Sequence, residues 1–145
     1  MIIGVIGGNY CTEEIRKIAY QLGKKIGMRK DVLVCGGMGG VMESVCKGAR
    51  NAGGVTIGII PGKNKEEANH YIDIPIVTAM SHARNAIIVR TADVVIALDG
   101  EYGTLSEIGL ALACGKKVIG IKTWDIKGVI RVNSIEEALL KVDEK

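Results

Sequence analysis

The sequence predicts an α/β fold: one Rossmann-like, doubly wound parallel sheet with helices on both faces, built by residues 1–145 as a single domain. Two observations favour this fold. Short apolar runs rich in Ile and Val alternate with stretches of helical periodicity, which is typical of parallel strands joined by right-handed crossovers. The chain also holds 20 glycines and no Phe, a composition that suits tight turns between strand and helix.

The first half of the chain predicts two strand–turn–helix units followed by two further strands. The first strand spans Ile2 to Ile6 and ends at Gly7-Gly8, and Thr12 is the expected N-cap of a helix that continues to Ile26. The next expected elements are a strand at 32–35, a helix with Val41, Val45 and Ala49 that stops at Gly53-Gly54, a strand at 55–60, a loop or short helix at 63–70 and a strand at 72–77.

The second half continues the same alternation. The expected elements are a helix at 81–91, a strand at 94–98, a turn at 99–103, a helix at 104–113, a strand at 117–121, a short strand at 129–132 and a closing helix at 134–142. No linker or low-complexity segment interrupts this series.

Composition narrows the function classes. The net charge of +3 comes from 19 basic and 16 acidic residues that are intermingled, and aromatic residues are scarce, which argues against nucleic acid as the main partner. The four cysteines form no C-x-x-C pair and have no paired His ligands, so we expect no metal site and no disulfide. No apolar run approaches a membrane span of about 18 residues. We therefore expect a cytoplasmic protein that does not enter a membrane.

Three glycine-containing turns follow predicted strands. They are Gly7-Gly8, the segment with Gly36, Gly37, Gly39 and Gly40, and the pair Gly100 and Gly103. Ligands of such sheets bind beyond the carboxyl ends of the strands, so we expect these turns to line one crevice. The segment 36–40 opens a helix, and its amides could hold a phosphate; the alternative is that its glycines only permit close packing.

Two segments carry candidate side chains, each with a structural alternative. Gly103 and Thr104 could offer amides and a hydroxyl to an anion, with Glu107 one turn further on; alternatively Thr104 and Glu107 form a capping box. Arg84 near a helix N-terminus opposes the helix dipole, which hints at a partner in the crevice, either a phosphate or Glu107. A solvated arginine is the alternative.

Read together, three segments resemble a known superfamily. They are residues 34–43 (VCGGMGGVME), residues 58–62 (GIIPG), and the series that runs from 82–85 (HARN) through 92–98 (ADVVIAL) to 100–107 (GEYGTLSE). The superfamily includes the LOG family of nucleoside 5'-monophosphate phosphoribohydrolases and the molybdenum cofactor carrier proteins. The compact length and the Gly-Glu-x-Gly-Thr turn resemble the short, carrier-like branch.

The resemblance implies roles for particular residues. The LOG pattern, an Arg followed by P-G-G-x-G-T-x-x-E, places the essential pair at Arg84 and Glu107 and a 5'-phosphate at Gly100, Gly103 and Thr104. Asp99 and Glu101 stand where that pattern has Pro and Gly, and they add negative charge beside the phosphate position. Asn85 replaces the Lys that usually follows the Arg. These departures favour binding over catalysis.

We therefore expect a carrier-like protein that binds a small phosphorylated ligand, a nucleotide or the molybdenum cofactor, with no further cofactor required. The rival hypothesis is a phosphoribohydrolase with Arg84 and Glu107 catalytic, and a third is a sensor. The resemblance also implies a homodimer or larger homo-oligomer. Ligand selectivity would depend on loop side chains, for which the candidates are Asn9, Tyr10, Met38, Met80 and Tyr102.

Overall fold

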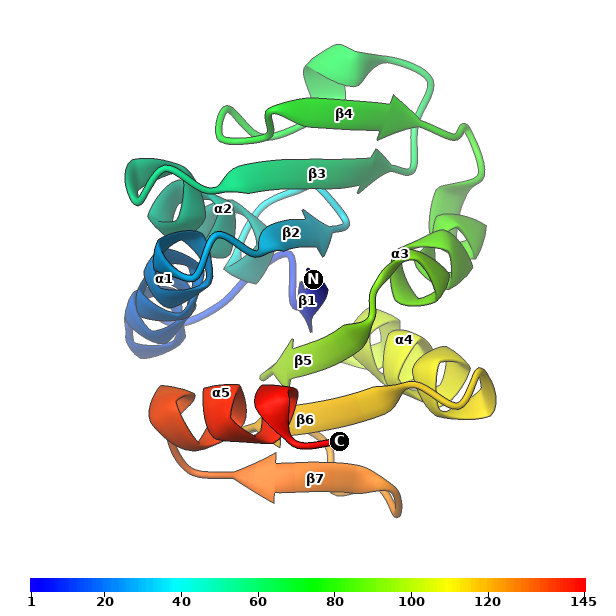
Figure 1. Cartoon of the computed structure of the whole chain (residues 1–145). Coiled ribbons are helices and arrows are strands. Elements are labelled where there is room, and N and C mark those ends of the chain that lie inside the picture. The colour runs from blue at the N-terminus through cyan, green and yellow to red at the C-terminus, as the bar shows by residue number, and fades with distance from the viewer.

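The computed structural model describes all 145 residues and contains one sheet of seven strands in the order β4-β3-β2-β1-β5-β6-β7 (Figure 1). Every neighbouring pair is parallel. The strands are β1 (Ile2–Gly7), β2 (Val32–Cys35), β3 (Val55–Ile60), β4 (Ile74–Val77), β5 (Val94–Leu98), β6 (Lys117–Ile121) and β7 (Val129–Val132). The predicted Rossmann-like α/β fold is confirmed.

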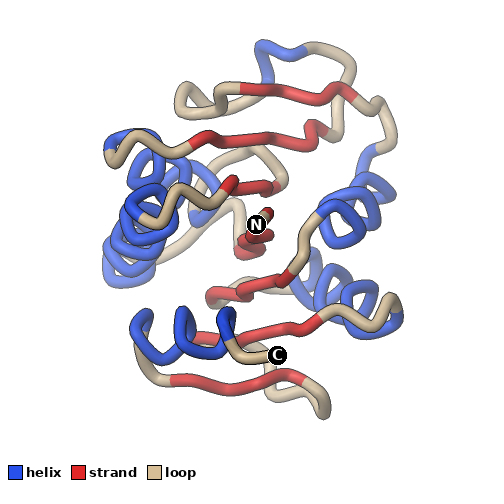
Figure 2. The backbone as a smooth tube through the Cα atoms, viewed as in Figure 1, coloured by secondary structure: helices blue, strands red, loops and turns tan.

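Five α-helices cover the two faces of the sheet. They are α1 (Glu13–Met28), α2 (Val41–Asn51), α3 (Asn85–Thr91), α4 (Tyr102–Ala113) and α5 (Ile135–Asp143), with 3-10 turns η1 (Lys65–Glu67) and η2 (Ser81–Arg84). Figures 1 and 2 show α1, α2 and α5 on one side and α3 and α4 on the other. None of the helices combines the length and apolar character that crossing a membrane requires.

The sheet separates two hydrophobic clusters. The larger has 21 buried residues and joins the sheet to α1, α2 and α5; the smaller has 11 and joins it to α3 and α4. Strand order changes direction at β1: β2, β3 and β4 are added on one side of β1, and β5, β6 and β7 are added on the other. A reversal of this kind separates the turns that follow β1 and β5 and leaves a crevice between them.

Helices α1 and α2 touch through their backbones. A Cβ atom on Gly23 would lie 1.9 Å from the carbonyl oxygen of Val45, and one on Gly48 would lie 2.0 Å from that of Tyr20. No side chain fits at either position, because both neighbours are backbone atoms. The two glycines therefore fix the spacing of this helix pair.

Three predicted boundaries were wrong. The helix expected at 81–91 is divided into a 3-10 turn, η2, and the α-helix α3; the positive φ of Ser81, 52°, lies at the start of η2. The strand expected to begin at Ile72 begins at Ile74, since the amide of Ile72 bonds to Asn69 in a turn. Helix α4 begins at Tyr102, two residues before the expected start.

Candidate functional site: a crevice at the carboxyl edge of the sheet

A cavity of about 360 Å³ lies at the carboxyl ends of the strands, between the turns that follow β1, β2 and β5. We call it the crevice. Its lining residues are Gly7, Gly8, Asn9, Tyr10, Met38, Met42, His82, Arg84, Asn85, Glu101, Gly103, Thr104 and Glu107. Six of the residues predicted from the sequence line the crevice: Gly7, Gly8, Arg84, Gly103, Thr104 and Glu107. Five other predicted residues do not line it: Gly36, Gly37, Gly39, Gly40 and Gly100.

Glu107 is buried in the wall of the crevice without a partner. Its residue is 7% exposed, and its carboxylate makes no hydrogen bond or ion pair within the chain. Burial raises the pKa of Glu107 to about 8, and the positive charge of Arg84 opposes this shift only in part. A carboxyl group with a pKa in this range can both donate and accept a proton near neutral pH.

Arg84 is buried, so the solvated alternative is wrong for this residue. Its Nε donates to the carbonyl oxygen of Ile59 at 3.0 Å, and a terminal guanidinium nitrogen donates to the carbonyl oxygen of Gly36 at 3.4 Å. A third bond goes to the side-chain oxygen of Asn85. Burial lowers the pKa of Arg84, and the nearby Glu107 opposes that change. The guanidinium thus ties the ends of β2 and β3 together while placing a cation beside Glu107.

The expected capping box of Thr104 and Glu107 does not form. Because α4 begins at Tyr102, its N-cap is Glu101, and no side chain caps it. The first helical amide with a backbone partner is that of Leu105, which bonds to Glu101 at 2.9 Å. The amides of the first turn, at residues 102–104, have no acceptor in the chain, and Gly103 and Thr104 line the crevice. Free amides at a helix N-terminus form a site suited to an anion.

The turn between β2 and α2 uses its amides differently. Three of them bond within the chain: Gly37 to the sulfur of Cys35 at 3.3 Å, Gly39 to Oδ1 of Asn9 at 2.8 Å, and Val41 to the carbonyl oxygen of Gly8 at 3.0 Å. These bonds join the turn to the loop after β1. They reduce the number of donors that it can offer to a ligand.

One aromatic and one acidic exposed side chain line the crevice, and further ones lie beside the start of α4. Tyr10 is 88% exposed and Glu101 is exposed; both line the crevice. The indole nitrogen of Trp124 donates to the carbonyl oxygen of Glu101 at 3.1 Å, and its ring lies 6.0 Å from that of Tyr102, centroid to centroid. Asp99 adopts a φ of 53° before the first turn of α4. Tyr10 and Glu101 thus bring one flat ring and one negative charge to the crevice itself.

Sequence reasoning missed one contributor, Met42, and did not foresee the structural role of Asn85. Met42 lines the crevice from inside α2, where its helical spacing gave it no distinguishing signal. Asn85 donates to the hydroxyl of Ser106 at 3.1 Å and thereby connects α3 to α4. The sequence had pointed to Asn85 only as a departure from the LOG pattern. No group of three or more His, Cys, Asp or Glu side chains is placed to hold a metal ion.

These features define a Rossmann-like protein with a ligand crevice at its topological switch point. The model of the SLOG cluster4 family matches residues 1–145, and the chain belongs to that family. The predicted relation to LOG and molybdenum cofactor carrier proteins is confirmed by the proteins to which the chain is similar.

Similar sequences include enzymes with LOG names. The chain is 49% identical over 122 residues to an uncharacterized protein of Archaeoglobus fulgidus, covering 84% of this chain and 80% of that protein. It is 38% identical over 121 residues to the cytokinin riboside 5'-monophosphate phosphoribohydrolase of Mycobacterium tuberculosis, covering 77% of this chain and 64% of the enzyme. It is 33% identical over 133 residues to the probable cytokinin riboside 5'-monophosphate phosphoribohydrolase LOGL9 of rice (Oryza sativa), covering 90% of this chain and 57% of that protein. The chain thus spans less than two thirds of either LOG protein.

Solved structures of molybdenum cofactor proteins match nearly end to end. The molybdenum cofactor binding protein of Rippkaea orientalis is 41% identical with a TM-score of 0.92, covering 97% of this chain and 94% of that one. The molybdenum cofactor carrier protein of Chlamydomonas reinhardtii is 34% identical with a TM-score of 0.87 and the same coverage.

Proposed function

We propose that the protein is a carrier that binds a phosphorylated, nucleotide-like compound, of the molybdenum cofactor type, in the crevice. The observation that carries this proposal is the free first turn of α4 beside a wall of flat or apolar side chains. Gly103 and Thr104 offer amides to a phosphate, and Tyr10 and Met38 line the side formed by the turns after β1 and β2. The near full-length similarity to two molybdenum cofactor proteins supports the same function.

The chain's own residues suggest how such a cargo would be held. The amides of the α4 first turn would bind the phosphate, while Arg84 supplies a fixed positive charge from the floor. Glu107, protonated in part near neutral pH, would hydrogen-bond a ring or sugar group without the full repulsion of a carboxylate. Tyr10 would cover the planar part of the cargo. No residue in this account has to transfer a proton.

One observation favours the rival function, a nucleoside monophosphate phosphoribohydrolase. Glu107 and Arg84 are both buried in the crevice, and the pKa of Glu107 is raised to about 8, as in an acid–base catalyst. The similarity to LOG enzymes supports the same activity. Acidic Glu101 at the mouth works against it, because it would repel a nucleotide phosphate arriving at α4.

Turnover distinguishes the two functions. The protein and its Glu107→Gln variant are incubated with nucleoside 5'-monophosphates, and free base and ribose 5-phosphate are measured by chromatography. The carrier proposal expects no product from either protein. Base released by the parent but not by the variant would establish the hydrolase instead.

Binding is tested through the single tryptophan. Trp124 is hydrogen-bonded to Glu101 at the N-cap of α4, so its fluorescence should report a ligand at the free amides. Molybdenum cofactor released from a molybdoenzyme, AMP and inorganic phosphate are titrated separately. We expect saturable binding of the cofactor, weakened by Gly103→Ala, whose added methyl group enters open space in the crevice. A flat titration with all three probes would overturn the proposal.

A further inference from the structure

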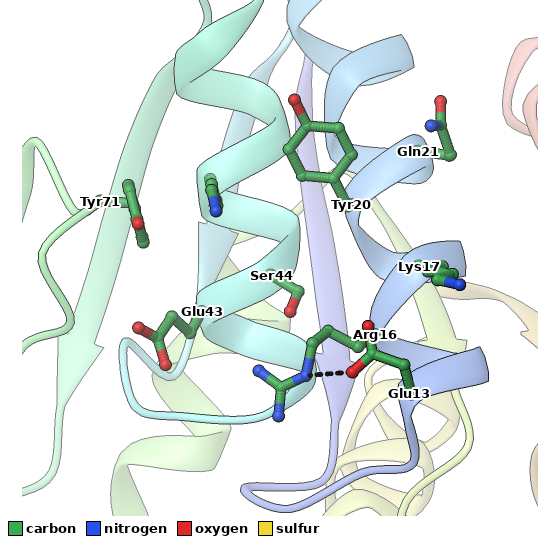
Figure 3. A pocket seen from close by; sticks show the side chains of 9 residues that line it. Glu13, Arg16, Lys17, Tyr20, Gln21, Glu43, Ser44 and Tyr71 are labelled. Carbon is green, nitrogen blue, oxygen red and sulfur yellow. Dashed lines mark ion pairs between the residues drawn. The ribbon is translucent and has the colours of Figure 1, made fainter.

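A second hollow lies between the N-terminal halves of α1 and α2 (Figure 3). We call it the α1–α2 groove. Its volume is about 280 Å³, and it shares no lining residue with the crevice. The lining residues are Glu13, Arg16, Lys17, Tyr20, Gln21, Glu43, Ser44, Lys47 and Tyr71. Neither the sequence motifs nor the proposed function uses this groove.

The walls of the groove are fixed in place. The backbone contacts at Gly23 and Gly48 hold α1 and α2 together beside it, at a distance that allows no side chain between them. The side-chain nitrogen of Asn51 donates to the hydroxyl of Tyr20 at 3.2 Å, which restrains that ring. A ligand would therefore meet a preformed site and would not have to separate the helices.

Ser44 supplies a hydroxyl that has no partner within the chain. The residue is 5% exposed, and its hydroxyl makes no hydrogen bond to another residue. Figure 3 shows its oxygen directed between the helices, on the side where Arg16 lies. No side-chain oxygen or nitrogen of the protein is both buried and unpaired, so this hydroxyl is reached from the groove and can donate a hydrogen bond to a ligand there.

Three basic and two acidic side chains line the groove. Arg16, Lys17 and Lys47 line it, and neither lysine has a carboxylate within ion-pair distance. Arg16 pairs loosely with Glu13, its Nε 3.6 Å from the carboxylate, as the dashed line in Figure 3 marks. Glu43 is the other acid of the lining and has no ion pair. The first turns of two helices add their positive dipole ends, so an anion is favoured.

Two tyrosine rings give the groove flat sides. Tyr20 comes from α1, and Tyr71 lies across α2 from it, with the ammonium of Lys47 5.8 Å from the Tyr71 ring centroid. Rings of this kind bind planar groups at a low cost in conformational entropy. The carboxylates of Glu13 and Glu43 can accept hydrogen bonds from hydroxyl or amino groups of the same ligand.

We propose that the α1–α2 groove is a second binding site, for a small phosphate monoester that carries a ring. Its phosphate lies among Ser44, Arg16 and Lys47, and its ring lies against a tyrosine. The chemistry is shared by aryl phosphates and nucleoside monophosphates. The two hollows have no lining residue in common, so their occupation can be followed separately.

The test is a titration of isotope-labelled protein with phenyl phosphate, followed by amide chemical shifts. Phenyl phosphate carries both the dianion and the ring, and inorganic phosphate is the probe without the ring. We expect saturating shifts at Tyr20, Ser44 and Lys47, separate from any shifts at Gly103 and Thr104. Inorganic phosphate should bind at least about tenfold more weakly, since it lacks ring contacts.

Variants assign the contacts. Arg16→Ala with Lys47→Ala should weaken phenyl phosphate binding at least about tenfold, and Ser44→Ala about threefold, because each removes a donor to the phosphate. Lys24→Ala is the matched control: this lysine is exposed on α1 and does not line the groove. It should leave the affinity unchanged.

Three outcomes would overturn the proposal. They are shifts confined to the crevice amides, equal affinity for phosphate and phenyl phosphate, and equal weakening by Lys24→Ala and the double variant. Because the shifts are read residue by residue, binding in the groove is distinguished from binding in the crevice, and failure of the cofactor titration of the crevice leaves this site standing.

Discussion

Two glycine-containing turns at the same edge of the sheet differ in how many of their backbone amides are hydrogen-bonded within the chain. The turn before α2 bonds three of its amides within the chain, including Gly39 to Asn9. The turn before α4 leaves the amides of its first helical turn without acceptors, at the wall of the crevice. The glycine run of the first turn serves backbone packing, whereas the second turn keeps donors available. Glycine content therefore does not identify an anion site; the partners of the amides do.

The largest expected effect comes from Gly40→Ala in the packed turn. Gly40 has a φ of 59°, and a Cβ there would lie 2.3 Å from the carbonyl oxygen of Gly8. Strain and overlap with backbone together should lower the free energy of unfolding by at least about 3 kcal/mol. Urea denaturation measures this loss.

Gly53→Ala separates conformation from packing in that measurement. Gly53 has a φ of 80° but open space around it, so only the conformational cost of about 1 to 2 kcal/mol should remain. Equal losses in the two variants would show that the packing of Gly40 against Gly8 contributes nothing.

Glu107→Gln tests the burial of charge beside the open turn. The folded-state pKa of Glu107 is about 8, above its unfolded value of about 4.3, so the folded state binds the proton more tightly. The contribution of Glu107 to stability is greatest below pH 4.3 and declines as the pH rises to about 8. The uncharged variant avoids this decline and should be more stable by about 2 to 4 kcal/mol at pH 9.

Unfolding curves of both proteins from pH 4 to pH 9 give the difference directly. It should vanish at the acid end of this range. A variant that is slightly less stable at every pH would instead fit a hydrogen-bonding role of the carboxylate, as in a helix cap.

Asn9→Ala should have a smaller effect on the packed turn. It removes the acceptor of the Gly39 amide, a bond of 2.8 Å at an exposed position. We expect a loss of about 1 kcal/mol and faster hydrogen exchange at Gly39. Asn9→Asp keeps an acceptor and should retain the slow exchange; fast exchange in both variants would mean that another feature protects this amide.

The smallest effect is expected for Gly103→Ala in the open turn. Gly103 lies within α4 and has no atom within 4 Å of an added Cβ. Alanine should therefore stabilise the protein by about 0.5 to 1 kcal/mol, in contrast to Gly40→Ala. Thermal unfolding would detect the change, and a loss of stability would show that the start of α4 needs the freedom of glycine.

The fold was predictable because the apolar pattern of each strand and helix can be read from that element's own residues. Periodicity and Gly-Gly turns located the seven strands, although one expected helix is divided into η2 and α3. The site was predictable only in part. The pattern around Arg84 and Glu107 placed both at one edge of the sheet, but their burial depends on β2, β3 and α3, which the local sequence does not describe.

The missed features have the same origin. The capping box failed because Tyr102 and Gly103 joined the helix, and the bond from Trp124 to Glu101 that accompanies this start spans distant parts of the chain. The α1–α2 groove depends on the close approach of Gly23 and Gly48, which only the packed pair of helices reveals.

The position of β1 in the middle of the sheet has a consequence for biosynthesis. Strands β2, β3 and β4 extend one edge of β1, while the other edge pairs with β5. A nascent chain that ends before residue 94 can form only the first half of the sheet, and it exposes the apolar edge of β1. Such an edge invites pairing with other chains. Translation through β5 covers this edge of β1, and the equally apolar edge of β5 is covered only when β6 follows.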